Sequence, residues 1–298
     1  MWAMSQTVIA PLPSRAVIAV SGIDAKSFLN GLLSQEIETL GVGELRFTGL
    51  LTPQGRLLYD LFVAGTADGV LLDVAAEHRD AILTRLTMYR LRAKVDLAAS
   101  ELSVFAQFSA QPGERRGPDH EVQETKDESG SRHSPGGAAG GWFQDPRLPS
   151  LGARSYANNL PHTAAEDDYD AHRLALGVPG PADWATDKTY PIEADFDLLN
   201  GIDFKKGCFV GQETTSRMKR RGVIKTRMLP ITFDGPPPAF GTEVLSGTLR
   251  AGEVLSGRDG RAMALLRLDR IEGAALTVEG RAVAVDRPDW VPGSTPAV

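Results

Sequence analysis

The sequence contains a single cysteine, Cys208, among its 298 residues. A single thiol cannot form an intramolecular disulfide, so the composition gives no sign of an oxidising compartment. One thiol also cannot complete an iron–sulfur site within the chain, and no zinc-type spacing of cysteine and histidine occurs. Histidine is scarce as well, which disfavours catalysis by a cysteine–histidine pair; the five are His78, His120, His133, His162 and His172.

Long apolar runs are absent too, since no window approaches the roughly 18 uninterrupted apolar residues of a membrane span. The first charged residue is Arg15, which follows two prolines, so the N-terminus fits neither a secretory leader nor an arginine-rich transit peptide. We therefore expect a cytoplasmic protein with no membrane partner. The net charge of −6 argues against direct binding of nucleic acid, because such proteins normally carry a basic face.

Apolar spacing in the first part of the chain predicts a mixed α+β layer. A helix with one buried face follows Asp24, whose carboxylate can accept hydrogen bonds from first-turn amides. Two apolar, β-rich runs surround the turn TPQG at 52–55, which predicts a β-hairpin. A strand at 70–75, a helix within 77–94 and an extended segment near 95–97 are expected to follow.

The chain is expected to fall into four segments. Residues 1–108 are predicted to form a first α+β unit. Residues 109–141 are rich in glycine, proline, serine and charge, so they cannot repay their ordering entropy and are predicted to be a mobile loop inside a domain. Residues 142–227 are expected to form a second α+β unit. Short strands between glycine and aspartate turns then predict a small β-barrel over 228–298.

The segment KKGCFVGQE, residues 205–213, places Cys208 between two glycines and directly after two lysines. From residue 205 to residue 227 there are eight lysines and arginines, and Glu213 is the one acidic residue. In a protein with a net negative charge this is a sharp local inversion. Because the protein as a whole is acidic, any anion-binding site is expected to be local.

The residues after Gly211 predict a short helix, so Cys208 would lie just before the N-terminus of that helix. Cationic side chains on one side and helix amides on the other would favour the thiolate, which is the reactive and metal-binding form. Gly207 and Gly211 indicate a tight loop. The alternative is an inert, buried cysteine beside a solvated basic face, and these residues alone leave both interpretations open.

Residues 191–233, PIEADFDLLNGIDFKKGCFVGQETTSRMKRRGVIKTRMLPITF, resemble the signature of the folate-binding YgfZ/IBA57 family of iron–sulfur cluster assembly factors. The segments SGIDAKSFLNGLLSQEI, LLTPQGRLLYDLFV and YRLRAKVDL are similar to the opening helix, the hairpin and the end of the first unit in that family. The resemblance covers nearly the whole chain except residues 109–141. It departs from the family where TTSR replaces the commoner form with small residues.

The resemblance implies an aminomethyltransferase-like α+β fold, in which two ferredoxin-like units and a small C-terminal β-barrel surround a central channel that binds tetrahydrofolate. It also implies a non-enzymatic role in the assembly or repair of 4Fe–4S proteins, with A-type carrier proteins and recipient 4Fe–4S enzymes as partners. A eukaryotic source would place the protein in the mitochondrial matrix. Cys208 would be the functional thiol and would share a transient cluster with a partner. The residues that would shape its loop are Lys206, Gly207, Gly211, Gln212, Glu213 and Arg217.

The resemblance also implies residues for folate. Glu193 matches the position that holds the pterin ring in related aminomethyltransferases, where a carboxylate accepts from the ring N–H and amino groups. The alternative for Glu193 is a helix cap or an ion pair. Arg92, Lys94 and the basic cluster at 217–227 are candidate cations for the glutamyl tail, with a solvated face as the alternative.

The predicted hairpin bears on whether the protein is an enzyme. Aminomethyltransferases of this fold carry an acidic pair in the second hairpin strand, and this sequence has Tyr59 and Asp60 there. With half of the pair kept, Asp60 remains a candidate folate residue, and the alternative is a structural role such as pairing with Arg56. The alternative functions are a folate-dependent aminomethyltransferase or demethylase-like one-carbon enzyme and, less favoured because of the net charge, a helper that acts on tRNA.

Overall fold

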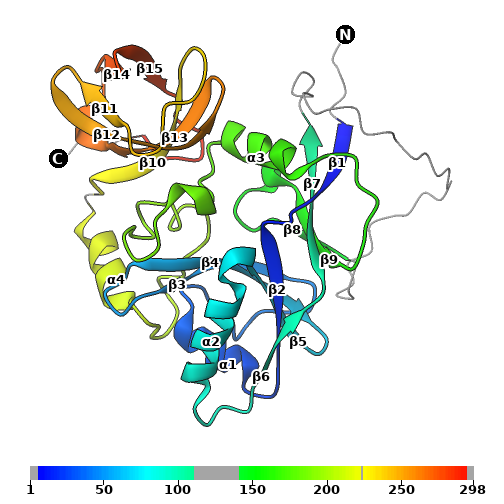
Figure 1. Ribbon diagram of the computed structural model, residues 1–298. Helices are drawn as coiled ribbons and strands as arrows, with labels where there is room; N and C mark the ends of the chain where they lie inside the picture. Colours follow the sequence, from blue (N-terminus) through cyan, green and yellow to red (C-terminus); the bar gives the residue numbers. More distant parts are fainter. Residues whose placement is uncertain (1–5, 111–140, 223, 294–298) are drawn as a thin grey trace. The chain divides into compact units, whose positions relative to one another are not determined.

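The computed structural model describes residues 6–110, 141–222 and 224–293 (Figure 1). These residues divide into two compact units, and the chain passes between them several times. The first unit comprises Met1–Lys26, Thr39–Leu45 and Phe62–His172. The second unit comprises Ser27–Glu38, Arg46–Leu61 and Arg173–Val298.

A four-stranded sheet in the first unit has the order β1-β7-β9-β8. Its strands are β1 (Gln6–Pro11), β7 (Ser103–Ala110), β8 (Trp142–Gln144) and β9 (Ala153–Ala157), and neighbouring strands are antiparallel. The sheet thus joins strands from both sides of the predicted loop, and the first unit extends to His172. Of that predicted loop, residues 109 and 110 end β7, and residues 111–140 lie outside the described residues.

The second sheet has five strands in the order β3-β4-β5-β2-β6. Its strands are β2 (Arg15–Ser21), β3 (Leu45–Leu51), β4 (Leu57–Thr66), β5 (Gly69–Ala75) and β6 (Asp96–Ser100). Strands β3 and β4 enclose the turn at 52–55, which confirms the predicted hairpin. Helix α2 (Arg79–Arg90) buries Ile82 and Leu86, which lie about one helical turn apart.

The remaining helices are α1 (Ala25–Leu32), α3 (Glu166–Ala175) and α4 (Gln212–Arg221). Short 3₁₀ turns are present at Ala76–His78, Pro149–Leu151, Pro181–Asp183 and Leu268–Arg270. The helices predicted after Asp24, within 77–94 and after Gly211 are all present. Strands β1 and β2 were not predicted, although the alternating burial of β2 is typical of a strand with one face in the core.

The C-terminal strands close into a six-stranded barrel with the order β10-β13-β12-β11-β14-β15. The strands are β10 (Thr226–Thr232), β11 (Glu243–Ser246), β12 (Leu249–Arg258), β13 (Arg261–Arg267), β14 (Leu276–Val278) and β15 (Arg281–Val285). Leu229, Ile231, Val254 and Leu266 are among the fully buried residues of its interior. The barrel is therefore a packed core, and its first strand begins two residues before the predicted boundary at 228.

Within the first unit, β2, β5 and β9 bring charged side chains into a buried cluster. Asp73 accepts from Arg15 Nε at 2.6 Å and from Arg154 Nη1 at 2.7 Å. Asp145 accepts from Arg147 Nη2 at 2.8 Å. Burial alone would raise the pKa of Asp145, but Arg147 and Arg154 hold that pKa below its ordinary value. In this cluster the buried carboxylates and guanidinium groups therefore compensate for one another's loss of hydration.

Candidate functional site

The predicted functional thiol is exposed. Cys208 lies on the loop before α4, four residues ahead of Gln212, where that helix begins, and it is a free cysteine. The alternative that Cys208 is buried is therefore wrong, and its reactivity stays a prediction. The position just before a helix N-terminus agrees with the prediction, and the thiolate state of Cys208 stays a prediction.

Lys206 holds this loop against α1. Its ammonium donates to the carbonyl oxygens of Asn30 at 2.7 Å, Leu33 at 2.8 Å and Gln35 at 2.8 Å. These carbonyls lie at and just beyond the C-terminal end of α1, where main-chain acceptors lack helical partners. Val210 N adds a hydrogen bond of 3.3 Å to the Gly31 carbonyl. The loop that carries the thiol is thereby tied to a helix.

The structure gives Lys206 an anchoring role, and the prediction that its charge also favours the thiolate of Cys208 stays a prediction. An ammonium has three protons to donate, and all three of those on Lys206 are directed to carbonyl oxygens. Burial lowers the pKa of Lys206 to about 8, although the charges of Glu36, Asp203 and Glu38 oppose the shift. Lys205 is the exposed member of the pair. Lys206 is close to Cys208 in the sequence, but in the fold its ammonium anchors the loop to the end of α1.

The two glycines that flank the cysteine differ. Gly211 has φ +84°, and a Cβ there would lie 2.6 Å from the Thr52 carbonyl oxygen, so only glycine fits without strain. Gly55 in the hairpin turn lies opposite, because its own added Cβ would be 3.0 Å from the Gly211 oxygen. Gly207 is not in the positive-φ region and would meet nothing within 4 Å. The tight-loop prediction is confirmed for Gly211 and wrong for Gly207.

The first turns of α4 carry the other loop residues of the motif. Gln212 begins the helix and is half-buried, whereas Glu213 and Arg217 are exposed at i and i+4 on one face. Glu213 lies in the first turn, where a negative charge is favoured by the helix dipole. These residues therefore belong to the first turns of the helix that follows the thiol, and their role toward Cys208 stays a prediction.

Some of the cations in the basic segment 205–227 are already paired with acidic side chains of the protein. Lys219 pairs with Asp197 at 3.3 Å, and Arg227 is buried between Asp195 and Asp197. Arg217 and Arg220 are exposed on α4. Of the candidate cations in 217–227, Arg227 is therefore neither on a solvated face nor open to a ligand, because it serves the interior of the second unit.

Glu193 uses both carboxylate oxygens inside the protein. Oε2 accepts from Tyr190 N at 3.0 Å, and Oε1 accepts from the Thr226 hydroxyl at 2.6 Å. The Glu193 carbonyl also accepts from Met228 N at 2.8 Å, so this residue joins the turn to the first barrel strand. The structure thus shows the capping role that the sequence offered as the alternative. Each carboxylate oxygen keeps further acceptor capacity, and the role toward the pterin stays a prediction.

Asp195, two residues on, is a fully buried acid on left-handed backbone, with φ +60°. Its Oδ1 accepts from Arg227 Nη1 at 2.6 Å, and among the described residues its buried Oδ2 has no hydrogen-bond partner. Asp197 takes two hydrogen bonds of 3.0 Å from the same guanidinium. Burial raises the pKa of Asp195 to about 8, the charge of Asp197 adds to the rise, and Arg227 opposes it.

This pKa predicts how stability depends on pH. Between the ordinary value of 3.8 and about 8, the folded state holds a proton on Asp195 that the unfolded state has lost, so stability falls as pH rises. Asp195→Asn cannot lose that proton, keeps an acceptor for Arg227, and tolerates the left-handed backbone. We expect its free energy of unfolding, relative to the wild type, to rise by roughly 1–3 kcal/mol from about pH 5 to pH 8 in urea titrations. A difference independent of pH would contradict the assignment.

The other candidate residues come from β4, from the residue just before it and from the turn after α2. Asp60 is buried in β4. Arg56 donates to the Lys188 carbonyl, and its guanidinium carbon lies 3.8 Å from the centre of the Tyr190 ring. Arg92 is exposed in the first unit, after α2, whereas Glu193 belongs to the second unit. Arg56 therefore contacts the residue whose amide donates to Glu193, and the folate roles of Asp60, Glu193 and Arg92 stay predictions.

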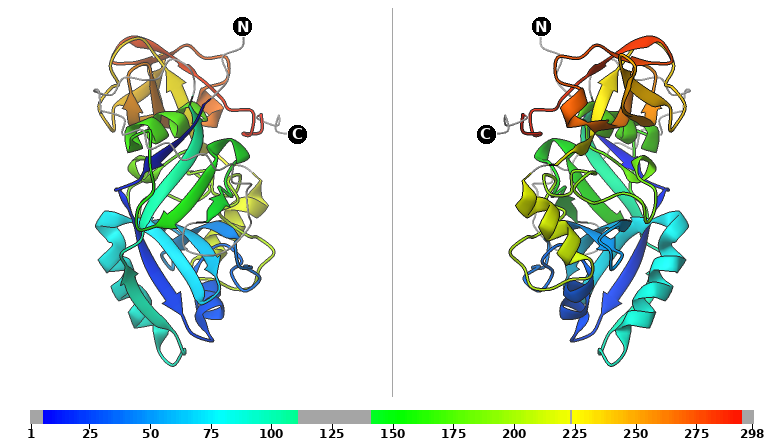
Figure 2. Two further views of the ribbon diagram at one scale, coloured as in Figure 1. Left: turned by 90° about the vertical axis from the view of Figure 1, so that its right-hand side faces the viewer. Right: turned by 90° about the vertical axis from the view of Figure 1, so that its left-hand side faces the viewer.

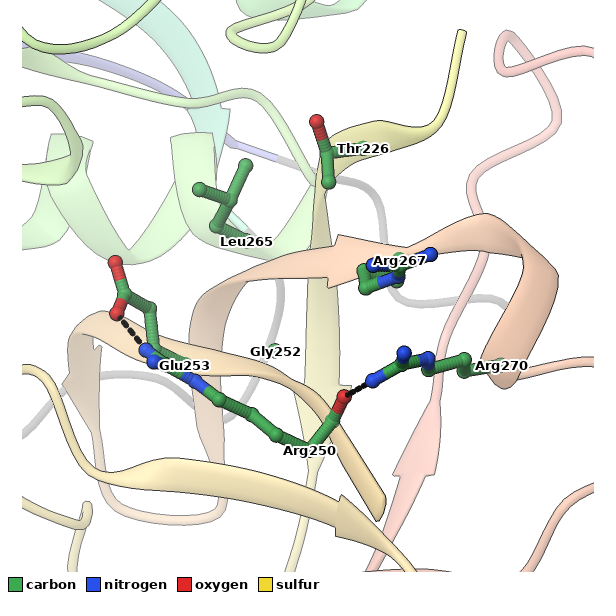
Figure 3. A pocket seen from close by; sticks show the side chains of 7 residues that line it. All are labelled: Thr226, Arg250, Gly252, Glu253, Leu265, Arg267 and Arg270. Atoms are coloured by element: carbon green, nitrogen blue, oxygen red, sulfur yellow. Dashed lines mark hydrogen bonds and ion pairs between the residues drawn. The ribbon is translucent and has the colours of Figure 1, made fainter. Parts of the chain in front are cut away.

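A cavity of about 300 Å³ opens on the barrel, and sequence reasoning did not find it (Figure 3). Arginines dominate its charged lining, with Arg250 paired to Glu253 at 2.5 Å and Arg270 bonded to the Arg250 carbonyl. Arg267 is the third. Thr226 also lines the cavity and bonds Glu193, so the cavity adjoins the candidate pterin residue. Arg250 comes from β12 and Arg267 from β13, and only the pairing of these strands in the barrel brings the three arginines to one cavity.

The comparisons with known proteins agree with this architecture. Residues 225–293 match the family model described as the CAF17 C-terminal β-barrel domain. The chain is 32% identical over 312 residues to the mitochondrial iron–sulfur cluster assembly factor IBA57 of Mus musculus, covering 94% of this chain and 84% of that protein. The chain belongs to the IBA57 family. The family resemblance predicted from the residues around Cys208 is thereby confirmed.

Other members of the IBA57 family are longer. The mitochondrial IBA57 homologue of Neurospora crassa is 31% identical over 250 residues, which are 77% of this chain and 55% of that protein. Among solved structures, aminomethyltransferase T of the glycine cleavage system from Bartonella henselae superposes with a TM-score of 0.72. The two chains are 18% identical and the match covers 96% of this one and 87% of the other. The predicted aminomethyltransferase-like fold is confirmed.

Proposed function

We propose that this protein assists the assembly or repair of 4Fe–4S proteins by lending the thiolate of Cys208 to a cluster that an A-type carrier protein brings. The observation that carries the proposal is an exposed, solitary thiol on a loop that Lys206 ties to α1. The names of the relatives, which are iron–sulfur cluster assembly factors, support the same role.

A solitary thiol fits a shared cluster. A cluster held by four cysteine thiolates needs ligands that this chain, with one cysteine, does not have, so a partner must supply the others. Binding then exchanges ligands without any change of oxidation state: the sulfur of Cys208 forms a bond to a cluster iron, one ligand leaves that iron, and the thiol proton passes to the ligand that leaves. The cluster is cargo, and recipient 4Fe–4S enzymes would take it onward.

The second part of the proposal is that tetrahydrofolate binds near Glu193. Support comes from the half-buried carboxylate of Glu193 and from the adjoining cavity with its three arginines. A pterin ring favours a carboxylate, and a glutamyl tail favours guanidinium groups. The relatives carry mitochondrial names, which favours the mitochondrial matrix over the predicted cytoplasmic location.

The test mixes the purified chain with an A-type carrier that holds its cluster, with and without tetrahydrofolate. We expect the wild type to form a coloured one-to-one complex in size-exclusion chromatography and Cys208→Ser to form none. Glu193→Gln, which keeps the thiol, should retain the complex and lose only the response to folate.

A complex of unchanged colour with Cys208→Ser would refute the shared ligand. In a separate incubation with tetrahydrofolate and a methylamine donor of the one-carbon unit, production of 5,10-methylene-tetrahydrofolate that depends on Asp60 would instead support the one-carbon enzyme.

A further inference from the structure

Two turns at one end of the first unit each present a bulky aliphatic side chain to solvent. Ile23, between β2 and α1, is 86% exposed, and Leu91, after α2, is 89% exposed. Met88, one helical turn before Leu91, is 64% exposed. Scattered exposed apolar residues are ordinary on protein surfaces, but a group of large ones marks an interaction site. The two views of Figure 2 show the dark blue end of β2 beside the loop after α2.

The two turns are bonded to each other. Lys94 N donates to Asp24 Oδ2 at 2.8 Å, and Asp24 N donates to the Lys94 carbonyl at 3.4 Å. Gly22 has φ +107°, and an added Cβ would lie 2.2 Å from the Lys94 oxygen, so the backbones are in close contact. Ile23 and Leu91 therefore belong to one structural end, which is called the apolar tip below and comprises Ile23, Met88 and Leu91.

Leu91 occupies backbone that suits glycine. Its φ of 43° and ψ of −104° place it at the second position of a turn closed by the 2.8 Å hydrogen bond from Ala93 N to the Arg90 carbonyl. Glycine dominates such positions because a side chain there is strained by about 1–3 kcal/mol. Folding alone would favour glycine. An exposed leucine on strained backbone does not help the protein to fold, so it points to a role in binding.

Cations surround the apolar tip. Residues 84–95 contain Arg85, Arg90, Arg92 and Lys94 and no acidic residue, although the chain as a whole carries a net charge of −6. The adjacent acids are Asp24, which accepts from the Lys94 amide, and the exposed Asp96. Arg92 and Lys94 are both exposed. Positive charge thus predominates on the side chains next to Leu91.

We infer that the apolar tip inserts into an anionic membrane surface. Ile23 and Leu91 are exposed over nearly their whole area, so they project from the protein instead of lining a flat or concave face. A fluid lipid interface can surround such projections, whereas a protein partner would need a matching pocket for each. Basic side chains next to the projecting residues are attracted to anionic headgroups.

This inference changes the expectation that the protein has no membrane partner. In the part of the chain that the structure describes, no helix is both long and apolar enough to span a bilayer. A search of the sequence for apolar runs detects spanning segments only. It cannot detect single residues that two distant turns bring together, as Ile23 and Leu91 are here. The contact proposed here lies in the plane of the interface and holds the protein reversibly.

The experiment uses flotation of the full-length chain with vesicles. One set is phosphatidylcholine alone, and the other contains about one third phosphatidylserine. We expect binding to the anionic set to be about tenfold stronger or more, and to be lost when salt is raised to about 0.5 M. Equal binding to both sets, or no binding to the anionic set at low salt, would overturn the inference. Such a result would leave a protein partner as the occupant of the tip.

Leu91→Gly separates membrane binding from folding. Glycine relieves the strain at φ 43°, so the variant should melt at the same temperature as the wild type or higher while binding anionic vesicles about fivefold less or weaker. Arg92→Gln with Lys94→Gln should weaken binding about tenfold or more, and the main-chain bonds of Lys94 remain. Phe240→Asp, at another exposed apolar residue on the barrel, is the control and should bind like the wild type. Wild-type binding by Leu91→Gly, or an equal loss in Phe240→Asp, would overturn the inference.

Discussion

Replacing Asp73 with alanine is expected to lower the free energy of unfolding by about 3–5 kcal/mol. Asp73 is fully buried and accepts from the guanidinium groups of Arg15 and Arg154, which are themselves buried. Without the carboxylate, two positive charges stay in the interior of the first unit and lose the partner that compensates for their desolvation. Urea unfolding followed by the fluorescence of Trp142, which lies in the same unit, would measure the loss.

A control isolates burial as the cause. Asp269 also pairs with an arginine, Arg267, with Nη2–Oδ2 2.9 Å, but both side chains are exposed on the barrel. Solvent screens that pair, so Asp269→Ala should change stability far less than Asp73→Ala. Equal losses from the two variants would mean that the buried cluster does not stabilise the first unit in the way described.

The helices and the hairpin could be predicted because their signals are local. In α2, for example, Ile82 and Leu86 are buried from a spacing that the sequence displays directly. Asp73 shows the limit of such reasoning. It interrupts an apolar strand, LLDVA, and nothing nearby indicates that Arg15 and Arg154, separated from it by 58 and 81 residues, will surround it. The network exists only once three strands are paired.

The candidate site divides in the same way. The helix that follows Cys208 was predictable from the glycine and the polar run in the sequence, whereas those residues left open whether the thiol is buried or exposed. The anchoring role of Lys206 was not, because its acceptors lie 171 to 176 residues away, at the end of α1. Because Lys205 and Lys206 are adjacent in the motif, the sequence suggested that both act on the thiol through their charge. The tertiary contacts instead anchor Lys206 and leave Lys205 exposed.

Lys206→Met is the second change with a large expected effect, and here the effect is on function. Methionine fills similar space but gives no proton to the carbonyls of Asn30, Leu33 and Gln35, so the loop loses its fixed position on α1. Misplacing a reacting group by about 1 Å commonly reduces rates by orders of magnitude. We expect the transfer of a cluster to a recipient enzyme to fall about tenfold or more while Cys208 stays accessible to alkylation.

Lys205→Met is the matched control, since it removes the same charge from the neighbouring, exposed residue. If the lysines act through their charge on the thiol, both variants should slow alkylation of Cys208 by iodoacetamide at neutral pH and reduce transfer alike. If Lys206 acts as an anchor, Lys205→Met should transfer clusters nearly as well as the wild type, and Lys206→Met alone should fail. Equal defects in transfer and alkylation would exclude the anchor. A loss of cluster transfer in Lys206→Met alone would show that transfer depends on the fixed position of the loop more than on the positive charge of the two lysines.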